Sequence, residues 1–418
     1  MVRYFWNVIG LLAVLALGAT SGVSAGGARP LVEAEAGVEA KAPVTILISI
    51  DGFKPEYLTR GATPNLNALA ASGVSASMRP SFPTVTFPNH FTLVTGLRPD
   101  RSGVVGNRME DSARPGQLFT MANDDPFWWT QAEPIWITAE KAGIPTATMF
   151  WPGSNVDFGG VRPRDWQQYA HAVNDRQRVD GIIDWLRRPA ATRPKFLTLY
   201  FDEVDTAGHG FGPDSAEATA AAASVDAAIG RLRAGLAALG QPANLVIVAD
   251  HGMAAISPDR VVRLDRLLPR QSFTAVADGP YVALTPKPGK TAKIEKILLG
   301  RHEHVTCYRK GDLPARLHYG RNPRVPPIVC LAETGWLALT TAPPADHPPR
   351  GGAHGFDSDA PEMRALFIAS GPAIKPAGVL PSVDNVDVAP LLRDLIGLPA
   401  ASDLDGDDSP FREILVRP

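Results

Sequence analysis

The sequence predicts an α/β protein in which helices flank a mainly parallel central sheet. Three apolar runs carry this prediction: residues 44–50 (VTILISI), 196–201 (FLTLYF) and 245–249 (LVIVA). Continuous apolar runs rich in β-branched residues are typical of strands that are covered on both faces, as in a parallel sheet. Helical segments alternate with these runs along the chain, which is the pattern of an α/β fold.

The other predicted elements of the core follow from the same patterns. Helices are predicted at 65–71, 134–142, 176–186, 215–239 and 386–396, and further strands at 146–150 and 363–369. Beyond residue 258 the alternation weakens, and proline becomes frequent between 269 and 349. Short strand-like runs at 281–285 and 336–339 remain there. We therefore predict a single catalytic domain over 44–418 with a smaller inserted lobe at about 265–350.

The N-terminal segment has the pattern of a secretory signal peptide over residues 1–25. Arg3 precedes an apolar run at 8–19, and Val23-Ser24-Ala25 is a small-residue cleavage site. The apolar run is short for a membrane span, so none is expected in the mature chain, although an uncleaved anchor is the alternative. Cleavage after Ala25 predicts a periplasmic or secreted protein. Residues 26–43 are then a linker of small residues.

Charge and cysteine content narrow the class further. The 418 residues carry a formal net charge of −2, so the chain lacks the basic field that a stable nucleic-acid complex would need. Its two cysteines, Cys307 and Cys330, have no C-x-x-C spacing. In an exported protein such a pair indicates one disulfide, with two buried thiols as the alternative. The sequence makes no prediction of oligomeric state.

The segment from Ser81 to Asn107 offers a candidate nucleophile. Thr84 and Thr86 lie between prolines, and Pro88 suits the first turn of a helix. Thr86 would then lie at or just before a helix N-terminus, where free N–H groups and the helix dipole attract anions. A hydroxyl beside an anion site is a candidate for phosphoryl transfer. A threonine that only caps the helix is the alternative.

Carboxylates and imidazoles follow the predicted strands. Ligands of open α/β sheets bind beyond the carboxyl ends of the strands, and this set of side chains is the ligand set of zinc or a similar divalent ion. Alone, each motif would be an ordinary turn, cap or loop, and the glycines around His209 (DTAGHGFG) favour a loop there. Together they predict a metal site. The candidates are Asp51, Asp205, His209, Asp250, His251 and His354.

The other histidines have weaker claims. His302-Glu303-His304 is a possible second metal pair, but it falls in the predicted lobe with no carboxylate-bearing strand predicted nearby, so we interpret it as surface. No role is predicted for His90, His171, His318 and His347.

Five separated segments resemble one known family. ISIDGF, PTVTFPNHFTLVTGLRPDRSGVVGN, DTAGHGFGP, ADHGM and GGAHGFD are similar, in the same order, to motifs of the nucleotide pyrophosphatase/phosphodiesterases of the alkaline phosphatase superfamily. The resemblance runs from about residue 44 to the C-terminus and suggests a secreted bacterial member. It implies an alkaline phosphatase-like core with two Zn²⁺ per chain.

The resemblance also implies roles for individual residues. It assigns Asp205, His209 and His354 to one zinc ion. It assigns the other zinc ion to Asp51, Thr86, Asp250 and His251.

On the same grounds Thr86, not Thr84, is the nucleophile, and Asn107 holds a non-bridging phosphate oxygen. Phe87 and Tyr169 resemble the pair that sandwiches a nucleobase, with Leu118 and Tyr200 nearby.

These roles imply a hydrolase that cleaves nucleotide phosphodiesters and pyrophosphates through a phosphothreonine and releases nucleoside 5′-monophosphates. The segment PTVTFPNHFTL contains no lysine or arginine, which favours diesters over more highly charged monoesters. Hydrolysis of choline phosphodiesters or phosphonoacetate on the same core is the alternative. A non-catalytic binding module is a further one, but all seven ligand and nucleophile positions hold competent residues.

Overall fold

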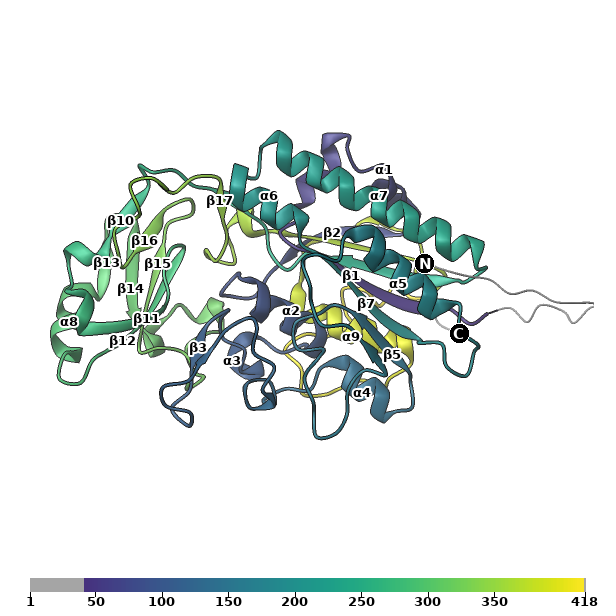
Figure 1. Ribbon diagram of the computed structural model, residues 1–418, viewed down its shortest axis with the longest axis horizontal. Helices are drawn as coiled ribbons and strands as arrows, with labels where there is room; N and C mark the ends of the chain where they lie inside the picture. The colour runs from purple at the N-terminus through teal and green to yellow at the C-terminus, as the bar shows by residue number, and fades with distance from the viewer. Residues whose placement is uncertain (1–40, 417–418) are drawn as a thin grey trace, which may run out of the picture. The chain divides into compact units, whose positions relative to one another are not determined.

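A mixed sheet of nine strands forms the centre of the fold in the computed structural model, which describes residues 41–416 (Figure 1). The predicted signal peptide, and the predicted linker up to residue 40, lie outside the described residues. Strand β1 (Val44–Ile50) lies between β7 (Phe196–Phe201) and β8 (Ala243–Val248) and runs parallel to both. Every residue of β1 is buried, as its continuous apolar run predicts.

The sheet extends on both sides of these three strands and confirms the predicted fold class. Beyond β7 lie β5 (Thr146–Met149) and β6 (Asp165–Trp166), both parallel. Beyond β8 lies β18 (Ala365–Ser370), which runs antiparallel to β8 and to β2 (Val74–Arg79). The sheet is therefore parallel through its centre and mixed on one side. Strand β2 also pairs in parallel with two short strands, β19 (Gly378–Val379) and β20 (Val383–Asp384).

The sequence analysis does not predict β2. Its residues, VSASMR, alternate between buried and half-buried positions, and four of the six are small or polar. Such a segment has a weak intrinsic strand signal, because strand preference depends on the neighbours against which the side chains pack. Pairing with β18 therefore decides its conformation.

Helices cover both faces of the sheet (Figure 1). On one side lie α1 (Pro64–Ser72), α5 (Asp175–Leu186), α6 (Glu203–Phe211) and α7 (Ala216–Ala238). On the other side lie α2 (Thr86–Thr95), α3 (Pro99–Ser102), α4 (Ile135–Lys141) and α9 (Val388–Ile396). The predicted helices and strands of the core agree with these elements to within two residues.

Helix α6 is an exception, because the sequence favours a loop around its glycines. The structure is helical from Glu203 to Phe211. Gly208 lies where a Cβ atom would be 3.0 Å from Cε of Met253, so this glycine permits close packing of the helix and does not mark a turn. The expectation of a loop was wrong because packing of α6 outweighs the low helix propensity of glycine.

Residues 265–350, where an inserted lobe is predicted, contain a second sheet with a core of its own. This five-stranded sheet is antiparallel, and α8 (Thr291–Leu298) contributes Ile294 and Leu298 to the same core. A disulfide joins Cys307 to Cys330 on adjacent strands, which is the pairing that the sequence predicts for an exported protein. The strands, in spatial order, are β11 (Phe273–Ala277), β12 (Tyr281–Pro286), β15 (Ile328–Ala332), β14 (Val305–Arg309) and β13 (Gly300–His302).

Three pairs of short strands lie outside these two sheets. They are β3 (Met109–Glu110) with β4 (Leu118–Phe119), β9 (Ala254–Ala255) with β17 (Gly352–Ala353), and β10 (Val261–Arg263) with β16 (Leu337–Leu339). Within residues 41–416, no helix is both long enough and apolar enough to cross a membrane.

The N-terminus of α1 is held by a carboxylate from α7. Oδ1 of Asp226 accepts the N–H of Leu66 at 2.8 Å, and Oδ2 accepts the N–H of Asn65 at 3.1 Å. The preceding residue, Thr63, makes no capping hydrogen bond with its side chain. Asp226 is 2% exposed, and its charge faces the positive end of the α1 dipole. It therefore both caps α1 and joins it to α7.

Asp226→Ala should lower the free energy of unfolding by about 3 kcal/mol, because two N–H groups at a buried helix end lose a charged acceptor. Asp180→Ala is a suitable control, since Asp180 forms an exposed ion pair with Arg231 at 2.6 Å. Loss of that pair should cost less than about 1 kcal/mol. Urea unfolding measures both effects, and equal losses in the two variants would contradict the capping role.

Candidate active site

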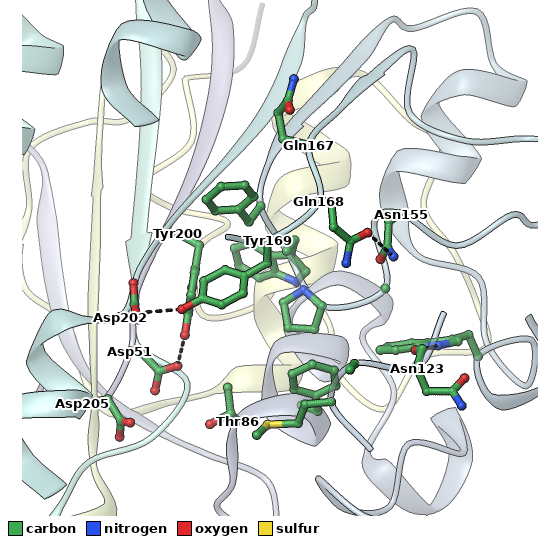
Figure 2. A pocket seen from close by; sticks show the side chains of 18 of the residues that line it. Asp51, Thr86, Asn123, Asn155, Gln167, Gln168, Tyr169, Tyr200, Asp202 and Asp205 are labelled. Atoms are coloured by element: carbon green, nitrogen blue, oxygen red, sulfur yellow. Dashed lines mark hydrogen bonds between the residues drawn. The ribbon is translucent and has the colours of Figure 1, made fainter. Parts of the chain in front are cut away.

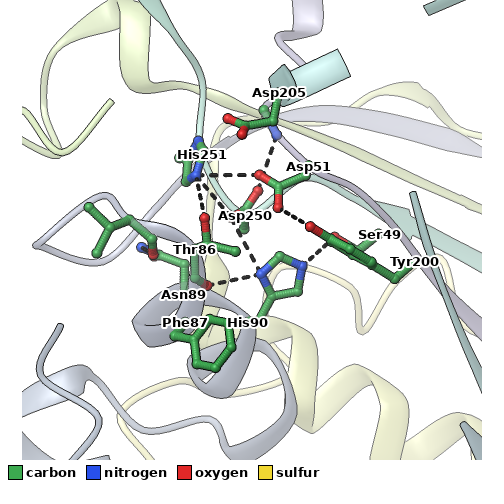
Figure 3. Close-up of polar contacts among 12 residues, drawn as sticks. Ser49, Asp51, Thr86, Phe87, Asn89, His90, Tyr200, Asp205, Asp250 and His251 are labelled. Carbon is green, nitrogen blue, oxygen red and sulfur yellow. Dashed lines mark hydrogen bonds and ion pairs between the residues drawn. The ribbon is translucent and has the colours of Figure 1, made fainter. Parts of the chain in front are cut away.

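Three aspartates meet at the carboxyl ends of the central parallel strands (Figure 3). Asp51 follows β1 directly, Asp250 follows β8, and Asp205 lies in the first turn of α6, which follows β7. Because these strands are parallel neighbours, their carboxyl ends share one edge of the sheet. Gly52 makes the turn at φ +68°, and a Cβ atom there would lie 3.1 Å from Cα of Asp205. The close approach of the strands therefore requires glycine at this position.

Three histidines surround the aspartates, and each has one ring nitrogen committed to the backbone. A carbonyl oxygen can only accept, so each Nδ1 carries a proton and each Nε2 presents its lone pair. This arrangement orients metal-ligating histidines in proteins. The Nδ1 atoms donate to carbonyl oxygens as follows: His251 to Gly252 at 2.9 Å, His209 to Gly352 at 3.0 Å and His354 to Thr84 at 2.9 Å.

The free Nε2 atoms face carboxylate oxygens. Nε2 of His251 lies 3.0 Å from Oδ2 of Asp250. Nε2 of His209 and of His354 lie 3.5 and 3.7 Å from the carboxylate of Asp205. Lone pairs therefore point at lone pairs, an arrangement that only a cation or an additional proton can stabilise.

The residue set fits a divalent metal ion. One carboxylate oxygen of each of Asp51, Asp205 and Asp250 is buried without a hydrogen-bond partner among the described residues. Two groups have ligand atoms within 4.8 Å of one another, and they share His251. Oxygen and imidazole nitrogen donors of this kind are typical of zinc sites. One group is Asp205, His251 and His354, and the other is Asp51, Asp250 and His251. His209 lies beside the first group but does not meet the 4.8 Å distance to all of its members.

Burial and crowding perturb the acidic groups strongly. Burial, and then the charges of Asp250 and Asp205, raise the pKa of Asp51 well above its usual range. Burial also raises the pKa of Asp205. Burial opposes ionisation of Asp250 too, but His251 and His90 outweigh it and hold the pKa of Asp250 well below its usual range. Such perturbed groups cluster at functional sites, and a bound cation would favour the charged form of all three carboxylates.

Of the two threonines in the proline-bounded segment, only Thr86 faces the cluster (Figure 3). It is the first residue of α2, and its Oγ1 lies 3.4 Å from Nε2 of His251. Thr84 is fully buried, and its hydroxyl donates to the carbonyl oxygen of Phe356 at 2.9 Å and accepts the N–H of Gly355 at 3.0 Å. The hydroxyl of Thr84 is therefore fully used in structural hydrogen bonds.

Asn107 lies beside the start of α2. Its Oδ1 accepts the N–H of Phe87 at 2.9 Å. This bond fixes the orientation of the amide, and the described part of the chain supplies no acceptor for its Nδ2. Asn107 therefore presents a free donor next to Thr86.

A cavity of about 290 Å³ adjoins Thr86, Asp51 and Asp205 (Figure 2). Aromatic rings and side-chain amides form much of its wall, and no lysine or arginine of the described residues lines it. Phe87, Tyr169 and Tyr200 all line it, whereas Leu118 lies in β4, outside the lining residues, and packs against the core. The other aromatic and amide lining residues are Trp129, Phe150, Trp151, Asn123, Asn155, Gln167 and Gln168.

Hydrogen bonds hold the two tyrosines of this cavity in place. Tyr200 donates its hydroxyl to Asp51 at 2.6 Å, and Tyr169 donates to Asp202 at 2.9 Å (Figure 2). Asp202 also accepts from the buried Arg178 at 2.7 Å, so its charge is already paired. Tyr169 remains 46% exposed, which leaves one face of its ring free for a ligand.

A second cavity, of about 340 Å³, adjoins Asn107 and His354. Arg108 and Arg270 line it together with Asp278. Arg108 directly follows Asn107 in the sequence, but the sequence alone assigned it no role. Arg270 lies far away in sequence, and only folding brings it near the site.

His90 is a site residue that the sequence analysis missed. It is completely buried; Nδ1 donates to the carbonyl oxygen of Thr86 at 2.9 Å, and Nε2 lies 2.8 Å from Oγ of Ser49. Nδ1 is also 3.4 Å from Oδ2 of Asp250. The spacing of four residues from Thr86 in a predicted helix was a signal that could have found it.

The remaining histidines lie away from the aspartate cluster. His171 accompanies Tyr169 in contacting Asp202, at 2.9 Å. Contrary to expectation, His304 does have a carboxylate partner from a neighbouring strand end: Glu333, at 2.8 Å. His302 instead contacts the carbonyl oxygen of Leu298 at 2.7 Å, so no metal group forms among the described residues there.

Comparison with known proteins agrees with this arrangement of fold and site, which is that of a metal-dependent hydrolase. A family model described as type I phosphodiesterase / nucleotide pyrophosphatase matches residues 45–357. The chain therefore belongs to this family, and it is a nucleotide pyrophosphatase/phosphodiesterase.

Individual relatives cover most of the chain. Bis(5'-adenosyl)-triphosphatase enpp4 of Xenopus laevis is 36% identical over 360 residues, which span 85% of this chain and 78% of that protein. Ectonucleotide pyrophosphatase/phosphodiesterase family member 3 of Rattus norvegicus is 35% identical, over 90% of this chain but 44% of that longer protein. The structure of murine ectonucleotide pyrophosphatase/phosphodiesterase 5, an inactive threonine-to-alanine variant in complex with AMP, has a TM-score of 0.85 at 33% identity and covers 90% of this chain and 100% of that one.

Proposed function

We propose that the chain is a two-zinc hydrolase of nucleotide phosphodiesters and pyrophosphates that releases nucleoside 5′-monophosphates through a phosphothreonine at Thr86. One observation carries the proposal: the hydroxyl of Thr86 lies between a buried set of metal-ligand side chains and an aromatic cavity. Two comparisons support it. One relative is a bis(5'-adenosyl)-triphosphatase, and another is inactive when a threonine is replaced and binds AMP.

The proposed metal ligands divide as the family resemblance implies. Asp205, His209 and His354 would hold one ion. Asp51, Asp250, His251 and the Thr86 hydroxyl would hold the other. When bound, such ions stabilise the alkoxide form of a nearby hydroxyl and the negative charge on phosphoryl oxygens.

The protein side chains then position the reacting groups. Oγ1 of Thr86 loses its proton and attacks phosphorus; the bond from Oγ1 to phosphorus forms, the bond to the leaving oxygen breaks, and the proton and the leaving group pass to solvent. The resulting phosphothreonine still carries the nucleoside through its 5′ oxygen. Water next attacks the phosphothreonine, releasing the nucleoside 5′-monophosphate and restoring the hydroxyl of Thr86. The free Nδ2 of Asn107 donates to a phosphoryl oxygen, and a donor of this kind is worth about 3 kcal/mol in the transition state.

The aromatic cavity suits a nucleobase better than the alternative substrates. Phe87 and Tyr169 offer ring faces for stacking, and Tyr169 is held by Asp202. A choline headgroup would need an unpaired acidic group in an aromatic cage, but the carboxylate of Asp202 is already paired with Arg178. A phosphonoacetate carboxylate would need cations, and none lines this cavity. Arg108 and Arg270 line the neighbouring cavity instead.

The proposal includes export and a division of the chain. Residues 1–25 act as a signal peptide cleaved after Ala25, and residues 26–43 as a linker. The catalytic domain spans 44–418 with its inserted lobe at about 265–350, and the mature enzyme is periplasmic or secreted. The signal pattern of the sequence and the disulfide between Cys307 and Cys330 support this assignment.

Thr86→Ala should lower kcat by roughly a thousandfold or more, because it removes the hydroxyl that attacks phosphorus. The variant should still bind about two zinc ions per chain, since six protein ligands remain. Thr86→Ser, which keeps a hydroxyl, should retain measurable turnover. Mass mapping of quenched wild-type enzyme should find a nucleoside monophosphate, ester-linked through its phosphate, on the peptide that contains Thr86. Substantial turnover by Thr86→Ala would refute the assignment.

Phe87→Ala and Tyr169→Ala should each weaken nucleotide turnover, since stacking on an aromatic ring is worth roughly 1–3 kcal/mol per base. The measurement is kcat/KM for a nucleotide ester beside kcat/KM for bis(p-nitrophenyl) phosphate, which has no nucleobase. We expect a selective loss on the nucleotide. Similar losses on both substrates would show that the rings do not form a base slot.

The enzyme should prefer diesters over monoesters by orders of magnitude, because its nucleoside cavity lacks the cations that would offset the extra charge of a monoester. Thymidine 5′-monophosphate p-nitrophenyl ester and p-nitrophenyl phosphate are compared at one pH with zinc present. The thymidine ester should have the higher kcat/KM and should release TMP. A monoester that is as good or better would make this protein a phosphatase.

A further inference from the structure

Of the candidate metal ligands, His354 lies farthest along the chain from a helix or long strand. His209 lies in α6, and His251 directly follows Asp250 at the end of β8. His354 instead lies in a loop that begins after the two-residue strand β17 and continues through Gly355, which has φ +111°. A ligand on such a loop needs fixed contacts from elsewhere to hold its position.

Thr84 supplies three such contacts from across the site. Its carbonyl oxygen accepts the Nδ1–H of His354 at 2.9 Å. Its hydroxyl accepts the N–H of Gly355 at 3.0 Å and donates to the carbonyl oxygen of Phe356 at 2.9 Å. One residue thus bonds to three consecutive residues of the loop, and the side chain makes two of those bonds.

Burial leaves little water to replace these hydrogen bonds if they are lost. Thr84 is completely buried, Phe356 is 1% exposed, and Gly355 is buried as well. Without the hydroxyl, a backbone donor and a backbone acceptor would lose their partners where water has little access, and leaving such groups unpaired is costly. The loop would move to satisfy them, and His354 would move with it.

Thr84 is itself fixed to the helix that carries Thr86. The side-chain Nδ2 of Asn89, in α2, donates to the carbonyl oxygens of Pro83 and Val85, both at 2.9 Å. Its Oδ1 accepts the N–H of Ser81 at 2.8 Å. Asn89 is completely buried, so the turn around Thr84 moves as one body with the N-terminus of α2.

We infer that Thr84 is a positioning residue. Its hydroxyl holds the His354 loop in a fixed position relative to α2, the helix that bears Thr86. It thereby sets the affinity for the metal ion that His354 binds. The inference rests on the proposed metal site. It gives the first threonine of the PTVTF segment a function distinct from that of the second. Thr84 acts through His354 and touches neither substrate nor the reacting atoms.

The test is the affinity for zinc, measured by competition with a chromophoric chelator, for the folded mature protein and its variants. Thr84→Val keeps the shape of the side chain but removes the hydroxyl. It should weaken the binding of one of the two ions by about 10- to 100-fold, the usual effect of losing a contact that orients a metal ligand. Thr84→Ser keeps the hydroxyl and should restore wild-type affinity.

Thr198→Val is the matched control. Thr198 is also completely buried and its hydroxyl also donates to a backbone carbonyl, that of Phe150 at 3.1 Å, but it does not contact the His354 loop. It should lower the melting temperature without changing zinc affinity. If Thr84→Val does not fold, Thr84→Ala replaces it, because alanine removes the hydroxyl without placing a methyl group against the N–H of Gly355.

Two results with the variants would overturn the inference. One is wild-type affinity for both ions in the variant without the hydroxyl. The other is an equal loss of zinc affinity in Thr198→Val, which would show that lower stability of the fold, and not loss of the Thr84 contacts, weakens zinc binding. A wild-type protein that binds no divalent ion would overturn the proposed metal site and, with it, this role for Thr84.

Discussion

The crowding of three carboxylates, two of them buried and one half-buried, at the carboxyl edge of the sheet is the constraint on which the rest of the site depends. Asp51, Asp205 and Asp250 approach one another because β1, β7 and β8 are parallel neighbours, and each keeps one buried oxygen without a hydrogen bond. Burial and mutual repulsion raise the pKa of Asp51 above its usual range. Only positive charge relieves such crowding, and the surrounding groups are arranged to place it there.

The backbone prepares the imidazoles for that charge. His209, His251 and His354 each donate Nδ1–H to a carbonyl oxygen, so all three present the lone pair of Nε2 to the carboxylates. The carbonyls belong to Gly352 in β17, to Gly252 after β8 and to Thr84 just before α2, and their positions come from the packing of the fold. The same packing brings the N-terminus of α2, with Thr86, against His251. The fold itself thus positions the candidate metal ligands and Thr86.

The two cavities beside the cluster differ in chemistry. The cavity next to Thr86 has aromatic and amide walls without a cation, whereas the cavity next to Asn107 and His354 contains Arg108 and Arg270. The two cavities therefore offer different surroundings, one suited to a planar base and the other to negative charge. Residues of the second sheet build part of the charged cavity, so this part of the chain contributes to the site as well as to stability.

The sequence by itself determined the fold class, the central strands and the residue types of the site, because buried parallel strands leave continuous apolar runs and because Asp51 and Asp250 follow such runs closely. It did not determine contacts between distant segments. The sequence suggested a loop around His209, but packing makes it a helix, and it assigned no role to His90, which folding places between Ser49 and Thr86. Those outcomes depend on packing between segments that are distant in the sequence. The local pattern of residues does not specify which distant segments contact one another.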